Sequence, residues 1–404
     1  MASLPEQLIA VLRQVLGKEG KILEKHSIAA GCKPGDNFMG EITKVTAHSR
    51  DGNGAHVEDK FVFKCPPADK AYREGLQSHK FVKNEEAFYS QVVPAMDEFL
   101  KLASGNKIAS VPVPIYFCST SDGDSDVLVL EDLSLSGFTL GDKVEGFNLE
   151  ECHFVLKKLG LFHAISLAMQ ELKPEEFFKV RNYIKEVFFF EEGRPQFSTI
   201  HFPCNAGVRM LQDRYPKKPE YVQKLRAVSD EFFTNLVEMV KTPTPLAVIN
   251  HGDCWVNNTM IKYEQGKPVD LRFLDFQIAR FSSLALDLSY LLYCSCQKSL
   301  LDQHYDEFIK TYVDAVNEAI LSMGAKKSII TKYQVDQEMK RFASFGVLHA
   351  LMAVPFFVTP VEDQPKLEGG IEVFDKFHQT TYKNVLIRDR VTDMIVHAIE
   401  RGFL

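Results

Sequence analysis

A short polar segment carries the side chains best suited to catalysis. His251-Gly252-Asp253 is followed by Asn258 in the pattern His-x-Asp-x-x-x-x-Asn, and a second aspartate, Asp275, comes after a later apolar run. Phosphoryl transfer needs a carboxylate that accepts or orients the attacking hydroxyl, and oxygen ligands for a Mg²⁺ ion that bridges nucleotide phosphates. We therefore predict Asp253 as the catalytic base, with Asn258 and Asp275 as metal ligands. His-Gly-Asp alone is equally typical of a turn or helix cap.

The N-terminal third must help to position these side chains, and its sequence predicts several short strands. Residues 28–48 are punctuated by Gly31, Gly35 and Gly40. Apolar runs predict extended segments over 61–64, 111–119 and 126–133. Helical spacing predicts helices over 5–16 and 78–101, the second of them kinked or divided at Pro94.

The rest of the chain is mostly helical. Helical periodicity prevails over 149–240 and 282–404, and it is interrupted at 246–276 by two apolar runs around a polar turn. We predict an α+β, two-lobed enzyme with a β-rich N-lobe over 1–130 and a mostly helical C-lobe over 131–404. The chemistry then lies on the interrupting loops.

Composition excludes several classes of protein. The chain of 404 residues is 45% hydrophobic and has a net charge of −7, which argues against a disordered chain and against nucleic acid as a partner. No apolar run approaches the ~18 residues of a membrane span, and the N-terminus shows no secretory signal. Eight scattered cysteines without a Cys-x-x-Cys pair favour reduced thiols and a cytoplasmic location.

Three motifs together resemble one family. The segments His251-Gly252-Asp253-x-Trp255-x-Asn257-Asn258, Leu274-Asp275-Phe276-Gln277 and 287–292 (DLSYLL) are similar to the ecdysteroid kinase-like family. This family, also called CHK kinase-like, is related to aminoglycoside phosphotransferases and choline kinases. The resemblance implies a protein-kinase-like fold with a helical insertion in the C-lobe, and ATP and Mg²⁺ as cofactors.

The same resemblance extends to upstream segments that would bind ATP. Lys64 ends a strand-like run in the position of the lysine that contacts the α- and β-phosphates, and Glu85 stands where its ion-pair partner is expected. Glu86 is the alternative partner. Taken alone, Lys64 is typical of a strand-end lysine with a solvated ammonium group, and the glutamates of an exposed acidic face.

Two further segments complete the expected nucleotide site. Gly35, Asn37 and Phe38 lie in a segment similar to the family's nucleotide loop, where backbone N–H groups approach phosphates. It is not the Gly-x-Gly-x-x-Gly loop of protein kinases. Glu131 and Leu133 resemble the hinge between lobes, whose backbone groups would bind adenine.

Several neighbouring residues have structural interpretations instead. His163 is expected to be buried in a helix, and Asp287 to cap a helix or brace the catalytic loop. Cys254 is expected to be a small buried residue. Trp255, the only tryptophan, either packs in the core or forms a wall of the acceptor site.

The acceptor is suggested by an excess of phenylalanine, with 31 Phe against 13 Tyr and 1 Trp. Two Phe-rich stretches, 177–190 and 345–357, suit a pocket for a lipophilic alcohol, although they are equally compatible with a helical core. The resemblance makes an ecdysteroid the leading candidate for this small lipophilic alcohol. The alternatives are a choline, ethanolamine or xenobiotic kinase, and a non-catalytic hormone-binding protein.

Overall fold

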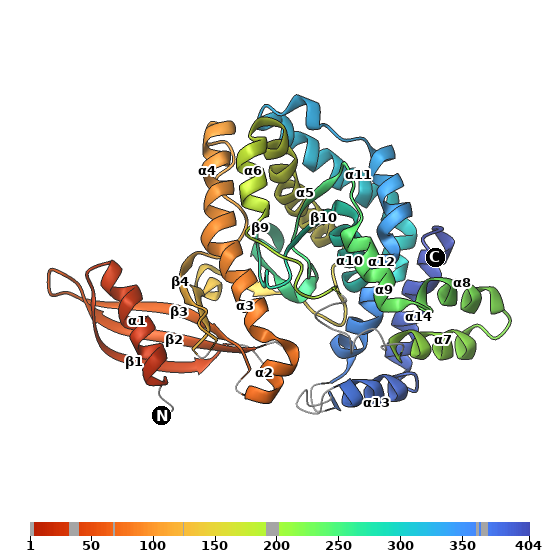
Figure 1. Ribbon diagram of the computed structural model, residues 1–404, viewed down its shortest axis with the longest axis horizontal. Coiled ribbons are helices and arrows are strands. Elements are labelled where there is room, and N and C mark those ends of the chain that lie inside the picture. The colour runs from red at the N-terminus through yellow and green to blue at the C-terminus, as the bar shows by residue number, and fades with distance from the viewer. Residues whose placement is uncertain are drawn as a thin grey trace.

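The computed structural model describes residues 4–31, 40–67, 69–123, 125–190, 202–360, 363–364 and 371–404. A β-rich part with the N-terminus occupies one end, and helices make up most of the remainder (Figure 1). The predicted α+β class, with a protein-kinase-like arrangement of a β-rich and a helical lobe, is confirmed. The boundary near residue 131 stays a prediction.

The N-terminal part is built on a five-stranded antiparallel sheet. Its strand order is β1 (Ile22–Ala30), β2 (Glu41–Arg50), β3 (His56–Cys65), β5 (Val127–Glu131) and β4 (Tyr116–Thr120). Helix α1 (Glu6–Lys18) packs its apolar face on this sheet, in a small core that includes Leu12, Val45 and Phe63. Alternate residues of β2 and β3 reach that core because successive side chains of a strand point to opposite faces.

The helix predicted over 78–101 is real, but it is interrupted. Helix α2 (Lys70–Leu76) leads into α3 (Ser78–Ala87), then one π-helical turn (Phe88–Val92), then α4 (Val93–Ala103). The wide turn ends just before Pro94, which has no N–H to continue an α-helical bond pattern. Such π-turns are frequent at functional sites, and this one begins three residues after Glu85.

The C-terminal part is a helical assembly around one large core. Helix α10 is buried along its whole length and packs against α12, while α11 packs against α5. The helices are α5 (Leu149–Leu172), α6 (Pro174–Arg181), α7 (Phe202–Arg214), α8 (Pro219–Ser229), α9 (Phe232–Lys241), α10 (Leu284–Ser295), α11 (Lys298–Ser322), α12 (Lys332–Val358), α13 (Ile371–Thr381) and α14 (Val385–Glu400).

Short strands interrupt these helices, and three of them, β7, β8 and β9, lie within the predicted interruption at 246–276. β7 (Ala247–Asn250) pairs with β10 (Arg280–Ser283), and β6 (Phe138–Leu140) pairs with the hairpin of β8 (Thr259–Glu264) and β9 (Lys267–Phe273). Gln265 and Gly266 both have positive φ, the conformation of a tight two-residue hairpin turn. The two pairings bring the end of β7 beside the segment that contains Asp275.

Two helices, α5 and α12, are long and apolar enough to cross a membrane by length and composition. However, 72% of the apolar window of each is buried inside the protein. Both begin with a capping box, in which the helix's first polar side chains satisfy its terminal N–H groups. These properties are typical of core helices, so α5 and α12 are only weak candidates for membrane spans.

Candidate active site

The loop after β7 presents Asp253 with both carboxylate oxygens engaged. Asn258 donates its side-chain amide to Oδ2 of Asp253 at 2.8 Å, and the Tyr290 hydroxyl donates to Oδ1 at 3.0 Å. Burial, and then the negative charge of Asp275, raise the pKa of Asp253 to about 7, against the effect of these hydrogen bonds. A carboxylate held in this way is oriented to accept a hydrogen bond or a proton from a bound hydroxyl.

Asp287 fixes the backbone of the loop that carries Asp253. Its carboxylate accepts hydrogen bonds from the backbone N–H groups of His251 at 2.6 Å and Gly252 at 2.9 Å, and contacts His163 Nε2 at 3.2 Å. Burial of Asp287 opposes its ionisation. The hydrogen bond and charge of His163, and then the other partners, outweigh the effect of burial, so the pKa of Asp287 lies below its usual range.

The glycine of this loop is required by close packing. Gly252 has φ of +90°, and a Cβ built on it would lie 2.1 Å from the carbonyl oxygen of Ile278. Any other residue would therefore push the loop away from the 275–279 segment. His251 is unsuited to be the base, because burial lowers its pKa to about 4 and keeps the ring neutral.

Asn258 and Asp275, the predicted metal ligands, are brought together by one backbone bond. The N–H of Leu274 donates to the carbonyl oxygen of Asn258 at 2.9 Å. Asp275 itself has φ of +66°, a left-handed conformation that is costly for a residue other than glycine and is concentrated at functional sites. The backbone thus sets Asp275 in a strained position beside the catalytic loop.

These two side chains have the chemistry that Mg²⁺ requires. Asn258 uses its amide nitrogen on Asp253, which leaves its carbonyl oxygen for a cation, and Asp275 has one oxygen beyond the Oδ1 that contacts Lys64. The described residues contain no group of three or more His, Cys, Asp or Glu that could hold a metal. A site of this kind suits Mg²⁺, which commonly takes one or two protein oxygens and completes its shell with phosphates and water.

Lys64 lies between two carboxylates. Its ammonium group donates to Glu85 at 2.6 Å and to Asp275 at 2.7 Å. Burial alone would lower the pKa of Lys64, but the two carboxylates outweigh it and keep the group charged. Burial raises the pKa of Glu85 to about 7, opposed by Lys64. Glu86, the alternative partner, instead accepts hydrogen bonds from Ser119 and Ser121.

A stack of rings joins these elements. Phe276 lies parallel to Phe88 of the π-turn, with 3.8 Å between ring centroids, and 4.3 Å from the ring of His251. Phe88 and Phe276 are both fully buried. The helix that carries Glu85, the segment that carries Asp275 and the loop that carries Asp253 therefore share one packed aromatic column.

Of the other residues predicted to bind nucleotide, the structure describes Glu131 and Leu133. Gly35, Asn37 and Phe38 lie outside the described residues. Glu131 ends β5, but its N–H already donates to the carbonyl oxygen of Ile115 at 2.9 Å. The backbone N–H of Glu131, one of the groups predicted to bind adenine, is therefore already used within the protein. Leu133 is buried and begins a 3-10 turn whose other residues are exposed.

Two residues that sequence reasoning missed contact the site. Tyr290 is one helical turn after Asp287, so the i, i+3 spacing would have placed both on the same helix face. Asn84, next to Glu85, donates its amide to the carbonyl oxygens of Gln277 at 3.1 Å and Ala279 at 2.9 Å. Its own carbonyl oxygen accepts from Lys185 N at 2.7 Å. No local pattern indicates these long-range bonds.

The two Phe-rich stretches meet in space. Phe189 and Phe345, both buried, have ring centroids 5.3 Å apart, whereas Phe178 is exposed. Trp255 is buried and stacks on Phe357 at 3.5 Å. Both stretches therefore contribute to the core around the catalytic loop.

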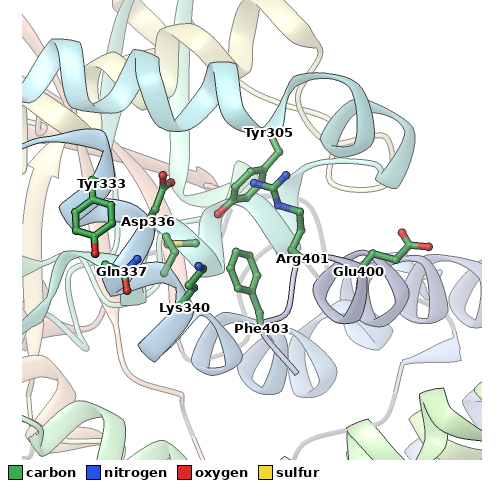
Figure 2. Close-up of a pocket in the computed structure, with 9 residues that line it drawn as sticks. Tyr305, Tyr333, Asp336, Gln337, Lys340, Glu400, Arg401 and Phe403 are labelled. Atoms are coloured by element: carbon green, nitrogen blue, oxygen red, sulfur yellow. The ribbon is translucent and has the colours of Figure 1, made fainter.

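A pocket of about 360 Å³ lies elsewhere, between α11, α12 and the end of the chain (Figure 2). Tyr305, Asp336, Lys340 and Arg401 are among its lining residues, and none of the predicted site residues is. It is separate from the candidate active site.

One comparison with known proteins identifies a family. The sequence model of the ecdysteroid kinase-like family matches residues 34–325. None of the curated proteins matches this chain.

Among solved structures, similarity is distant. A GDP complex of aminoglycoside 2'-phosphotransferase-IIIa is 13% identical, covers 93% of this chain and 99% of its own, and has a TM-score of 0.40. A glucosamine kinase bound to glucosamine, ADP and phosphate is 13% identical, covers 93% of this chain and 98% of its own, and has a TM-score of 0.29. We draw no functional conclusion from structures this distant.

Proposed function

We propose that this chain, which belongs to the ecdysteroid kinase-like family and is a small-molecule kinase, transfers the γ-phosphoryl group of Mg-ATP to a hydroxyl of a small lipophilic alcohol of the ecdysteroid class. The observation that carries this proposal is the meeting of Asp253, Asn258 and Asp275 with the Lys64–Glu85 ion pair. These residues come from distant parts of the sequence.

In the proposed reaction each residue has one task. Lys64, fixed by Glu85, would contact the α- and β-phosphates. Asn258 and Asp275 would hold Mg²⁺, which when bound neutralises charge on the phosphate oxygens. Asp253, oriented by Asn258 and Tyr290, would orient the acceptor hydroxyl and receive its proton as the oxygen–phosphorus bond forms.

The acceptor class rests on the family and on the core around the loop. Phe189 and Phe345 are buried in the core near Asp253, and pockets for lipophilic ligands are lined mostly by apolar and aromatic side chains of this kind. A cationic acceptor such as choline would be favoured by acidic or cation-binding aromatic walls. We further propose that the protein acts in the cytoplasm.

The test is an acceptor screen with Mg-ATP in which ADP release is measured. The panel contains ecdysone, other lipophilic alcohols, choline, ethanolamine and kanamycin. The proposal predicts ADP release above the acceptor-free rate with ecdysone or another lipophilic alcohol. Turnover with choline or kanamycin alone would contradict the acceptor class, and nucleotide binding without turnover on any alcohol would contradict the reaction.

A further inference from the structure

A buried arginine beside the catalytic loop has hydrogen-bond donors that no described residue accepts. Arg280 is only 2% exposed and begins β10, where it pairs with Asn250 of β7. Its Nε lies 2.6 Å from Oε2 of Glu186 in an ion pair, but none of the three guanidinium nitrogens has a hydrogen-bond partner within the described part of the chain. Buried guanidinium groups are costly unless their donors are matched.

A series of side-chain contacts connects Arg280 to Asp253. The guanidinium carbon of Arg280 lies 5.2 Å from the ring centroid of Phe189, and that ring is 5.2 Å from His349. His349 stacks on Tyr290 at 4.1 Å, and Tyr290 donates to Asp253. These contacts therefore connect the unmatched donors of Arg280 to Asp253, the predicted base.

Other unmatched polar atoms lie in the same place. Nδ1 of His349 and Oδ1 of Asn250 are buried and have no hydrogen-bond partner among the described residues. Asn250 shares a face of the small β7–β10 sheet with Arg280, because directly paired residues of an antiparallel sheet point the same way. Such a concentration of unmatched buried groups marks the position of bound water or of a ligand.

The charges of the cluster indicate what kind of ligand fits. Glu186 already neutralises Arg280, and it is held in place by accepting the N–H groups of Phe188 and Phe189, both at 2.7 Å. Burial, and then the charge of Arg280, lower the pKa of His349 to about 3, so its ring is neutral. The site therefore offers donors without net positive charge, which suits a neutral oxygen more than a carboxylate.

We propose that Arg280 binds a ketone or hydroxyl oxygen of the acceptor, so that the preferred acceptor is a lipophilic alcohol with a second oxygen group. This inference rests on the proposed function for the identity of the acceptor. One oxygen group is held by Arg280 while the reacting hydroxyl lies at Asp253, and a second point of attachment orients the reacting group. An alcohol that lacks the second oxygen leaves the buried donors unmatched and is discriminated against.

Equilibrium binding tests this without requiring phosphoryl transfer. Two pairs of probes differ by one ketone oxygen: p-ethylphenol against p-hydroxyacetophenone, and androstanol against epiandrosterone. Binding to the full chain with Mg-ADP is measured by calorimetry. We expect the ketone of at least one pair to bind about fivefold more tightly, the effect of one hydrogen bond, and Arg280→Met to remove that difference.

Controls separate this role from a structural one. Arg181→Met removes an arginine that also lies over phenylalanine rings, 4.8 Å from Phe178 and 5.0 Å from Phe281, and should keep the preference. Arg280→Lys keeps the charge but not the planar donors, and should weaken the preference. Stabilisation by Mg-ADP reports that each variant is folded.

Three results would overturn the inference: equal binding of both members of each pair by the wild type, an unchanged preference in folded Arg280→Met, or no binding of any probe. Equal binding would show that the donors of Arg280 are matched by water only. The proposed function fails separately, when no alcohol in the acceptor screen increases ADP release.

Discussion

At the scale of single residues, the chemistry depends on how Asp253 is held. Two donors, Asn258 and Tyr290, occupy its two oxygens, so the carboxylate has one orientation. Burial lowers the pKa of the neighbouring His251 to about 4, which keeps its ring neutral. In the proposed reaction the catalytic role therefore falls on the carboxylate of Asp253, whose neighbours fix it without themselves having to titrate.

Replacing Asp253 by Asn should remove catalysis and leave the fold. The amide oxygen can still accept one of the two hydrogen bonds, but the side chain can no longer take a proton. We expect kcat to fall by about 10²–10⁴-fold, the usual contribution of a positioned base, with little change in the thermal midpoint. Asp302→Asn, an exposed substitution on α11, should leave kcat unchanged. A kcat for Asp253→Asn within about tenfold of the wild type would contradict the role.

The residues that are close in sequence were the ones that could be predicted. Asp253 and Asn258 lie in one loop, and their types indicate the chemistry directly. Asp275 is predicted as a second metal ligand from its place after a later apolar run, whereas Lys64 and Glu85 are predicted only through the resemblance to a family. Tyr290 was missed although its i, i+3 spacing from Asp287 places it on the same helix face. Arg280 and His349 were missed because their positions beside Asp253 depend on how β10 and α12 pack, which no local pattern reveals.

At the scale of elements, Asn84 links the helix of Glu85 to two other segments. It bonds to the carbonyl oxygens of Gln277 and Ala279 and to the backbone N–H of Lys185. The segment after Asp275 and the Phe-rich stretch are thereby tied to the same residue of α3. Movement of this helix would displace both the metal-binding and the acceptor sides.

Asn84→Ala should therefore weaken both stability and turnover. The variant leaves two buried carbonyl groups and one N–H group without partners, at a cost of about 1–3 kcal/mol of unfolding free energy. We expect a lower urea midpoint together with a raised KM for ATP. Gln91→Ala, which removes an exposed amide that contacts Ser90, is the control. An unchanged KM for ATP in folded Asn84→Ala would contradict the coupling.

The bracing by Asp287 has a pH dependence of defined sign. Its folded-state pKa is below the value of 3.8 expected in the unfolded chain, so its ionisation stabilises the protein above that pH. This contribution is lost as pH falls through the lower, folded-state pKa. We expect the stability difference between wild type and Asp287→Asn to shrink below about pH 4, measured by urea unfolding. A difference that grows on acidification would contradict the assignment.

Elements differed in how far the sequence revealed them. The division of 78–101 near Pro94 was predicted, although not that it takes the form of a π-turn. β1 and β2 were not predicted, since β1 is half-buried at best and lacks the apolar alternation that signals a strand. The hairpin at 259–273 was indicated because its turn residues are polar and flexible.

At the scale of the molecule, the β-rich and helical parts meet through charged and aromatic contacts. Lys64 of β3 contacts Asp275, and Phe88 stacks on Phe276. Bound nucleotide would therefore stabilise the chain by bridging both parts, since a ligand that binds only the folded state raises its stability.

Mg-ATP should raise the thermal midpoint of the wild type, and Lys64→Met should lose that increase. At a hundred times its Kd the nucleotide would contribute about 2.7 kcal/mol. The comparison is made within each variant, with and without nucleotide, because Lys64→Met also leaves Glu85 and Asp275 without a cation. The same increase in both proteins would show that Lys64 does not contact the nucleotide.

The central claim is phosphoryl transfer to a lipophilic alcohol at Asp253 and Asp275. The most direct measurement is mass spectrometry of a panel of lipophilic alcohols after incubation with Mg-ATP and either the wild type or Asp275→Ala. Our account predicts that at least one alcohol gains a single phosphoryl group with the wild type and gains none with folded Asp275→Ala. No phosphorylated alcohol with the wild type, or an equal yield with Asp275→Ala, would contradict it.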